Sequence, residues 1–370
     1  MHRIAPPIAL FRRLTYVSSL SMLSVGWVLV SSASGLWAQS SPKPPSSSSR
    51  PSNPRIDLRP MLVPGSVLRY QVRLQTVTDT RRTGAISDPQ GPSRLVVTWD
   101  ATVRLEVLGE AGAAAAGAPI PKPKEVPGKS AAEPNPYSAP MRIRTTYERS
   151  VATVQSDSPD PEAEDTEQRY ARLQGAVIEF TIGTDGHVSD VHGLETVLDN
   201  EQVRQAAEQW MAQVTAPALS RQGVALGQTW NSAQPANSMP LAGMIWRSVS
   251  TYLRNESCRP AEPAAAPPSQ ELCAVILTRQ SVLPQKQVRD TTPDDYRRQG
   301  LRTSGHWAGS GESLSYVSLQ SHSAVSVTQD STQQIDFSVT NSSGNSVRFA
   351  GTIETHSRVA LLPPDSPDSP

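Results

Sequence analysis

The feature that most constrains the fold of this chain is an alternation of polar and apolar side chains with a period of two residues. Between Val67 and Gln75 every second side chain is apolar, and between Leu95 and Leu108 the apolar side chains again share one side. Such alternation is typical of β-strands that bury one face and expose the other. It recurs in residues 141–154, 176–182, 187–191, 245–253, 272–282, 314–327, 334–339 and 346–361. About ten strands predict a curved antiparallel sheet or an open half-barrel.

Two hairpins and one helix are predicted among these strands. Asp185-Gly186 separates two β-like segments and indicates a tight turn, because glycine accepts the positive φ that such a turn needs. Asn341–Asn345 indicates a second hairpin with a longer loop. The apolar side chains of Glu195–Val214 fall on one helical stripe and Pro217 follows, so this segment predicts one long helix. The predicted fold class is therefore mainly β (α+β), with the sheet packed on that helix.

The first 38 residues have the layout of a secretory signal peptide. Three arginines give a positive start, residues 14–30 are mostly apolar and uncharged, and Leu36-Trp37-Ala38 ends the segment with a small residue. Cleavage is predicted after Ala38, with Ala33 as the other candidate position. The alternative is a retained signal anchor, which would be the chain's one contact with the membrane. The predicted location is periplasmic or secreted.

Segments rich in serine, proline or alanine divide the remaining chain. Residues 39–60 bury too little apolar surface to offset the entropy of ordering, so they predict a disordered leader. Disordered insertions are predicted near 111–140 and 259–270, and a disordered tail at 363–370. The entropy of closing a loop grows slowly with its length, so such insertions are compatible with a single β-rich domain at 61–362.

The two cysteines predict a disulfide. Cys258 and Cys273 flank a loop crowded with proline and alanine. In an oxidising compartment such a pair is expected to form a bond, which stabilises a loop of this size by about 3 kcal/mol. A shared metal ion is disfavoured, because neither a C-x-x-C spacing nor a nearby histidine supplies the other ligands. A reactive thiol is the remaining alternative.

Charge and motifs argue against several functions. With 34 Lys and Arg against 34 Asp and Glu, the chain lacks the excess positive charge that binds nucleic acid. Gly309–Ser313 is the segment nearest to the G-x-S-x-G motif of hydrolases, but its spacing differs, so it predicts a flexible segment leading into a strand. A triad of Ser310 with His306 or His322 stays open, because triads are defined by geometry. No catalytic residue and no cofactor are predicted.

Histidines and acids do not indicate a metal site. No pair of histidines has the i,i+4 spacing of a helical zinc motif, and His187 and His192 point to opposite faces of one predicted strand. The acids between Asp157 and Glu167 lack the order of a calcium loop, so they predict a solvated acidic loop. The sequence therefore predicts no metal ligand.

Three tryptophans are candidates for a ligand groove. In Leu226–Trp230, Gly227 predicts a tight turn, after which Trp230 offers a large apolar face to the predicted helix. In the functional interpretation, Trp210, Trp230 and Trp246 line a groove between sheet and helix. In the alternative interpretation, they pack in the core.

The middle of the chain has a distinctive order of predicted elements. Gly175–Val191, the helical segment after it, and Val224–Trp230 stand in the order strand, DG turn, strand, helix, V-x-x-G-x-x-W. This order resembles uncharacterised exported bacterial β-rich proteins, which are distantly similar to envelope lipoprotein-carrier folds. The resemblance implies a curved antiparallel sheet around a helix, with an acyl chain as the ligand. The chain departs from the carriers by its proline-rich insertions and its cysteine pair.

Together these features predict a non-enzymatic exported protein of the bacterial envelope. It is expected to bind an apolar ligand or an envelope protein between sheet and helix. Two alternatives stay open: a secreted hydrolase with an unrecognised catalytic site, and a structural surface protein with the Ser/Pro leader as a spacer.

Overall fold

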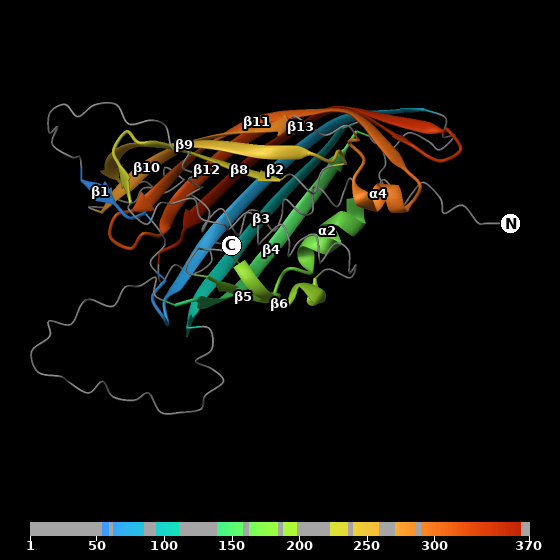
Figure 1. Cartoon of the computed structure of the whole chain (residues 1–370). Coiled ribbons are helices and arrows are strands. Elements are labelled where there is room, and N and C mark those ends of the chain that lie inside the picture. The colour runs from blue at the N-terminus through green and yellow to red at the C-terminus, as the bar shows by residue number, and fades with distance from the viewer. Residues whose placement is uncertain are drawn as a thin grey trace, which may run out of the picture.

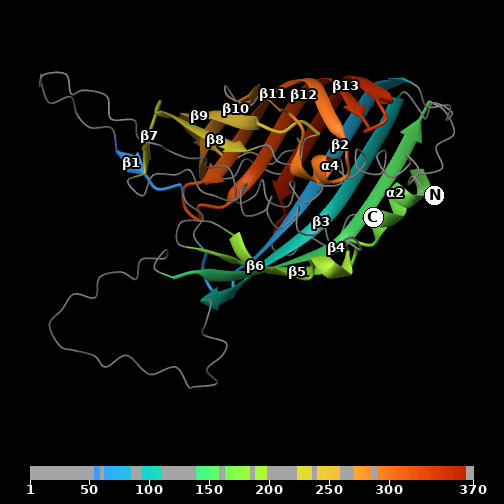
Figure 2. The same cartoon turned by 45° about the vertical axis from the view of Figure 1, so that its right-hand side comes forward.

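An antiparallel sheet of eleven strands dominates the computed structural model (Figure 1). The structure describes residues 54–58, 62–84, 94–110, 139–157, 163–183, 188–197, 223–235, 240–258, 271–285 and 290–363. The strands lie in the order β6 (Val188–His192), β5 (Val177–Ile182), β4 (Met141–Ser156), β3 (Arg94–Glu110), β2 (Val67–Gly84), β13 (Ser346–Leu361), β12 (Ala324–Thr340), β11 (Arg302–Ser318), β10 (Leu272–Pro284), β9 (Met244–Ser257) and β8 (Thr229–Pro235). The sheet curves but does not close, so β6 and β8 are its edges (Figure 2).

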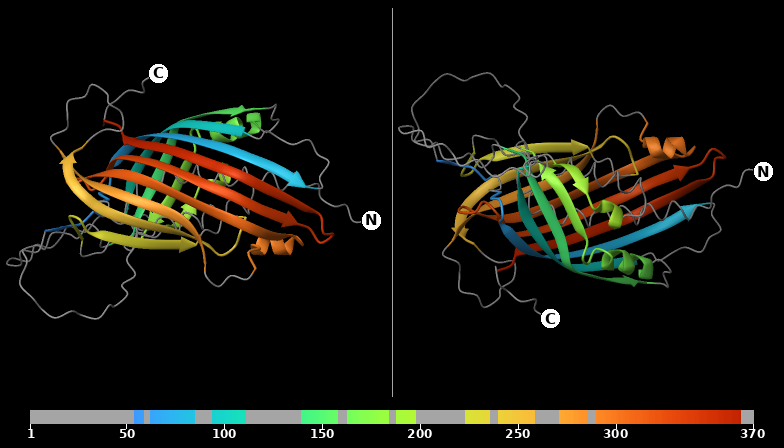
Figure 3. Two further views of the ribbon diagram at one scale, coloured as in Figure 1. Left: turned by 90° about the horizontal axis from the view of Figure 1, so that it is seen from above. Right: turned by 90° about the horizontal axis from the view of Figure 1, so that it is seen from below.

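Two meanders make up this sheet. Strands β2 to β6 form one and strands β8 to β13 form the other, each with successive strands as neighbours. The pairing of β13 with β2 joins them and places Val359 opposite Val72. The last described strand therefore lies beside the first long strand, as seen from above in Figure 3.

The smaller elements lie at the flanks of the sheet. Strands β1 (Arg55–Ile56) and β7 (Val224–Ala225) pair as a separate two-stranded sheet. Helix α2 (Ala163–Ala171) packs against β4, and the short helix α4 (Asp294–Arg298) contacts β11. A 3₁₀ turn, η2 (Leu194–Thr196), follows β6. None of the described helices is long and apolar enough to cross a membrane.

The predicted mainly β fold with an open, antiparallel sheet is confirmed, but one predicted strand is wrong. Residues 314–327 are the end of β11, a turn, and the start of β12. In the turn, the hydroxyl oxygen of Ser318 accepts hydrogen bonds from the backbone N–H groups of Gln320 and Ser321. Such side-chain bonds compete with strand pairing and reverse the chain. The serine-rich turn continues the polar pattern of the strands, so periodicity alone did not reveal it.

Gly309–Ser313, predicted as a flexible segment leading into a strand, lies in the middle of β11. Its residues pair with β10 on one side and with β12 on the other. Glycine lowers strand propensity, and the prediction rested on that local preference. The two neighbouring strands supply the hydrogen bonds that override it.

The acidic segment predicted as a loop is in part helical. Helix α2 begins within it, and Glu164 and Asp165 lie in the first turn, where the helix dipole favours negative charge. Near the other end, Tyr170 is 2% exposed. Burial of this ring against the sheet stabilises a helix that the polar sequence alone would not predict.

The long helix predicted for Glu195–Val214 lies outside the described residues beyond Val197. Its first residues belong to the 3₁₀ turn η2. The Asp185-Gly186 turn also lies outside the described residues, but β5 and β6 on either side of it pair antiparallel, with Ile182 opposite Val188.

The second predicted hairpin, at Asn341–Asn345, is confirmed. The N–H group of Asn341 donates to the carbonyl oxygen of Asn345 over 3.0 Å, between β12 and β13. The side-chain oxygen of Asn341 accepts from two further N–H groups of the turn. Gly344 has a φ of +83°, which favours glycine.

The disulfide joins the end of β9 to the start of β10. The sulfur atoms of Cys258 and Cys273 are 2.09 Å apart. The N–H group of Cys258 also donates to the carbonyl oxygen of Glu271. The bond therefore closes the base of the loop between these strands.

The two faces of the sheet differ in chemistry. The outer face carries cross-strand ion pairs, including those of Arg142 and Arg144 with Glu179. The hydrogen bond from Arg144 holds the pKa of Glu179 below its usual value. The opposite face, here called the inner face, buries Trp99, Trp230 and Trp307 to 1% exposure or less. The sheet curves around this inner face.

Candidate ligand-binding face

The structure places two of the three groove tryptophans on the inner face but in different clusters. Trp230 on β8 lies opposite Ser250, whereas Trp246 on β9 lies four positions further along the same strand pair. Trp230 packs with Leu58, Val224, Tyr252, Ala274, Ile276 and Val317. Trp246 is partly buried beside the cluster of Leu241, Met244, Val282, Trp307, Ile335, Phe337, Val339 and Phe349. Trp210 lies outside the described residues, so a groove lined by all three stays a prediction.

The inner face of β3 and β4 is filled by protein. Trp99 Nε1 donates to the hydroxyl oxygen of Ser150 over 2.9 Å, and that hydroxyl donates to the carbonyl oxygen of Tyr170 over 2.6 Å. The rings of Trp99 and Tyr170 lie 5.6 Å apart. These contacts fix α2 on the sheet, so this end of the inner face is a core.

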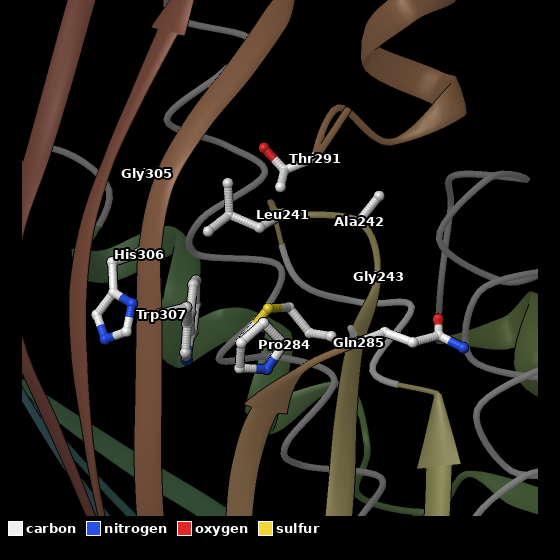
Figure 4. A pocket seen from close by; sticks show the side chains of 10 residues that line it. Leu241, Ala242, Gly243, Pro284, Gln285, Thr291, Gly305, His306 and Trp307 are labelled. Carbon is white, nitrogen blue, oxygen red and sulfur yellow. The ribbon is translucent and has the colours of Figure 1, made fainter. Parts of the chain in front are cut away.

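A small cavity lies at the opposite end of the inner face (Figure 4). Leu241, Pro284 and Trp307 are among its lining residues, and the side chain of His306 points away from it. Its volume is about 60 Å³. Sites for small organic ligands usually have several hundred Å³, so this cavity has room for a few water molecules only.

A band of small polar residues crosses the inner face between its apolar regions. We call it the polar belt and define it by two rows of cross-strand neighbours. One row is Ser250, Thr278, Ser313, Gln329 and Ser357; the other is Ser232, Ser248, Gln280, Gly311, Ser331, Thr355 and Thr76. From β8 to β2 the belt extends over roughly 29 Å, at the usual spacing of strands. No member of the belt carries a charge.

Apolar side chains lie on both sides of the polar belt. Tyr252, Ile276, Val327, Val359 and Val72 lie on one side, and Trp246, Val282, Trp307, Ile335 and Phe337 lie on the other. Along a strand, the inner face is thus apolar, then polar, then apolar again.

Some polar groups on this face bond to each other, and others have no partner within the described residues. Ser250 and Thr278 bond to each other through their hydroxyls at 2.8 Å. Gln280 and Gln329 are half-buried and have no side-chain hydrogen bond within the described part of the chain. Trp230 Nε1 is fully buried and also has no partner there, whereas Trp307 Nε1 donates to Gln333. Buried donors are almost always paired in proteins, so the indole N–H of Trp230 is an exception among the described residues.

The sequence contains a signal for the polar belt that pattern analysis missed. In Gln329–Gln333 both faces of β12 are polar, so the alternation breaks down in mid-strand. A strand that is polar on both faces within a sheet of alternating strands indicates a polar patch on the buried side. Only the register shows that such breaks on neighbouring strands coincide.

The residues weighed for catalysis are not gathered together. Ser310 and His306 both lie on the outer face of β11, four residues apart, which in an extended strand is roughly 13 Å. His322 lies in the turn after β11, and His187 is outside the described residues. Among the described residues, no group of three or more His, Cys, Asp or Glu could hold a metal ion.

Three buried tyrosines, Tyr70, Tyr147 and Tyr170, are expected to lower the stability of the protein at alkaline pH. Burial raises the pKa of Tyr147 to about 12, and it also raises the pKa values of Tyr70 and Tyr170. The unfolded chain releases these protons near pH 10. Stability is therefore full below about pH 10 and falls as the pH rises towards the folded-state values, because the unfolded chain then binds fewer protons.

We expect unfolding midpoints in urea to fall between pH 10 and 12, and we expect Tyr147→Phe to reduce that slope. Tyrosinate absorbance, recorded on the folded protein, provides the check. Three buried tyrosines that ionise near pH 10 without unfolding would contradict the prediction.

Comparisons with known proteins do not identify a family. No protein-family model and no curated protein matches this sequence. Lipovitellin, from a structure concerned with lipid–protein interactions, aligns with 83% of this chain at 10% identity and a TM-score of 0.37. The aligned part is 26% of the lipovitellin chain. An outer membrane channel from Pseudomonas putida F1 aligns over 82% of this chain and 97% of its own, at 8% identity and a TM-score of 0.19. Scores this low do not establish a shared fold or a function.

Proposed function

We propose that this protein is a non-enzymatic carrier or receptor that binds an elongated apolar ligand of the lipid class on the inner face of its open sheet. The observation that carries the proposal is the chemistry of that face. From β8 to β2, the registered inner positions are uncharged with the exception of Arg82, near the end of β2. The ion pairs between strands, such as Arg73–Asp100, Arg279–Glu312 and Arg348–Asp336, lie on the outer face. An uncharged concave face with large apolar areas favours an apolar ligand.

The described helices leave part of this face for a ligand. Helix α2 contacts β4 and helix α4 contacts β11, and no described helix makes comparable contact with β12, β13 or β2. Many inner-face residues of these central strands are buried, Ser357 and Thr76 among them, but Ile353 and Gln329 are half-buried. A ligand here would remove apolar surface from water, at about 25 cal/mol per Å².

The proposal includes the export predicted from the sequence. The signal-peptide layout of residues 1–38 supports a periplasmic or secreted location after cleavage at Ala38. The disulfide between Cys258 and Cys273 is compatible with an oxidising compartment.

The experiment is to purify the mature protein from a bacterial envelope and to analyse it by native mass spectrometry. We expect lipid-sized adducts, or one-to-one uptake of a long-chain fluorescent hydrocarbon by delipidated protein. Ile353→Asp, on the inner face of β13, should abolish uptake, and Thr352→Asp, its neighbour on the outer face, should not. Circular dichroism shows whether both variants fold. Lipid-free protein that takes up no hydrophobic probe, as expected if the chain covers its own inner face, would overturn the proposal.

A further inference from the structure

We infer that the ligand carries an uncharged hydrogen-bonding group, such as an ester or a hydroxyl, between two apolar parts, and that the polar belt binds this group. The inference rests on the proposed function and specifies the chemistry of its ligand. It follows from the order of side chains along the strands and from the neutrality of the belt.

The order of side chains sets the arrangement of the ligand. A hydrocarbon bound across the whole inner face would cover the amides of Gln280 and Gln329 without offering them hydrogen bonds. A ligand with polar atoms in its middle can pair with the belt and still place apolar parts on both sides. The inner face of β12 shows this order along one strand. It begins with the apolar Val327, continues with three polar residues, Gln329, Ser331 and Gln333, and returns to an apolar residue at Ile335. The ligand is thus expected to lie along the strands.

The absence of charge in the belt sets the nature of the ligand's polar group. All members of the belt are Ser, Thr, Gln or Gly. The arginines of the same strands, such as Arg279 and Arg348, pair with acids on the outer face. A phosphate or carboxylate moved onto this face would lose its water without meeting a cation. Neutral acceptors and donors match hydroxyl and amide side chains without that cost.

The test compares three lipids of similar chain length on the delipidated mature protein: dioleoylglycerol, which has neutral esters; dioleoylphosphatidate, which adds a charge; and the hydrocarbon squalane. Each competes with a bound fluorescent probe. We expect dioleoylglycerol to displace the probe at concentrations at least about ten-fold lower than either competitor, as several neutral hydrogen bonds provide. Phosphatidate or squalane binding equally well would overturn the inference and leave the proposed function standing. Failure of all three to bind would overturn both.

A pair of matched variants tests whether the polar belt recognises the polar group of the ligand. Gln329→Leu removes a belt amide from the inner face of β12, and Gln334→Leu makes the same change on the outer face of that strand. We expect the first to reduce the preference for dioleoylglycerol over squalane several-fold and the second to leave it unchanged. Equal effects of the two variants would overturn the assignment of the belt.

Discussion

Replacing Trp99 by alanine should lower the free energy of unfolding by about 3–5 kcal/mol, the range for deleting a buried tryptophan. Trp99 has no exposed surface, and its ring lies 5.6 Å from that of Tyr170 and 6.4 Å from that of Tyr147. The substitution opens a cavity under α2 and removes the donor to Ser150. Urea unfolding measures the loss. Hydrogen exchange should show faster opening of α2 than of β11, because α2 depends on this contact.

The control for Trp99 is phenylalanine, which keeps an aromatic ring and loses the N–H group. Trp99→Phe should cost about 1–2 kcal/mol, for one hydrogen bond and a smaller void. In both variants we expect the hydroxyl of Ser150 to keep the bond that it donates to the carbonyl oxygen of Tyr170. If Trp99→Ala cost less than about 1 kcal/mol, the core assigned to this end of the inner face would be wrong.

Replacing Gly351 by alanine should destabilise the protein by about 3 kcal/mol, at the upper end of the usual cost of overpacking. A Cβ atom at Gly351 would lie 2.0 Å from the carbonyl oxygen of Asp79 and 2.7 Å from the Cα atom of Thr80. Both atoms belong to the backbone of β2, so no side-chain rotation relieves the clash. Because β13 and β2 are the pair that joins the two meanders, amide exchange should accelerate in both strands.

Gly344→Ala is the matched control for Gly351→Ala. Gly344 lies in the turn between β12 and β13, has a φ of +83°, and would place its Cβ in open space. Alanine there should cost about 1–2 kcal/mol from the left-handed backbone alone. A cost at Gly351 no greater than that at Gly344 would show that β13 and β2 do not approach as closely as described.

Local patterns predicted most of the sheet and little of the candidate site. Strand β13 begins and ends at the predicted residues, Ser346 and Leu361. This was possible because side chains that alternate between water and the core produce a pattern within the strand's own sequence. The wrong predictions at 314–327 and Gly309–Ser313 share a cause. Serine and glycine favour turns over strands, but pairing with the neighbouring strands decides whether a segment that contains them forms a turn or a strand.

The candidate site depends on contacts between distant parts of the chain. Thr76 and Thr355 face each other in the polar belt although 279 positions separate them in the sequence. Trp230 and Trp246, both predicted to line a groove, lie in separate clusters because the register of β8 and β9 sets them four positions apart. Neither fact can be obtained from spacing within a single segment.

The amino-acid sequence by itself determined that this chain forms many strands with one apolar face, because a period of two residues is a local property of an extended backbone. The tertiary structure alone decided which polar residues meet on the inner face, where α2 packs, and that β13 pairs with β2. The physical reason is register: a side chain's neighbours across a sheet are chosen by long-range strand pairing, and a shift of one residue would turn every one of them to the opposite face.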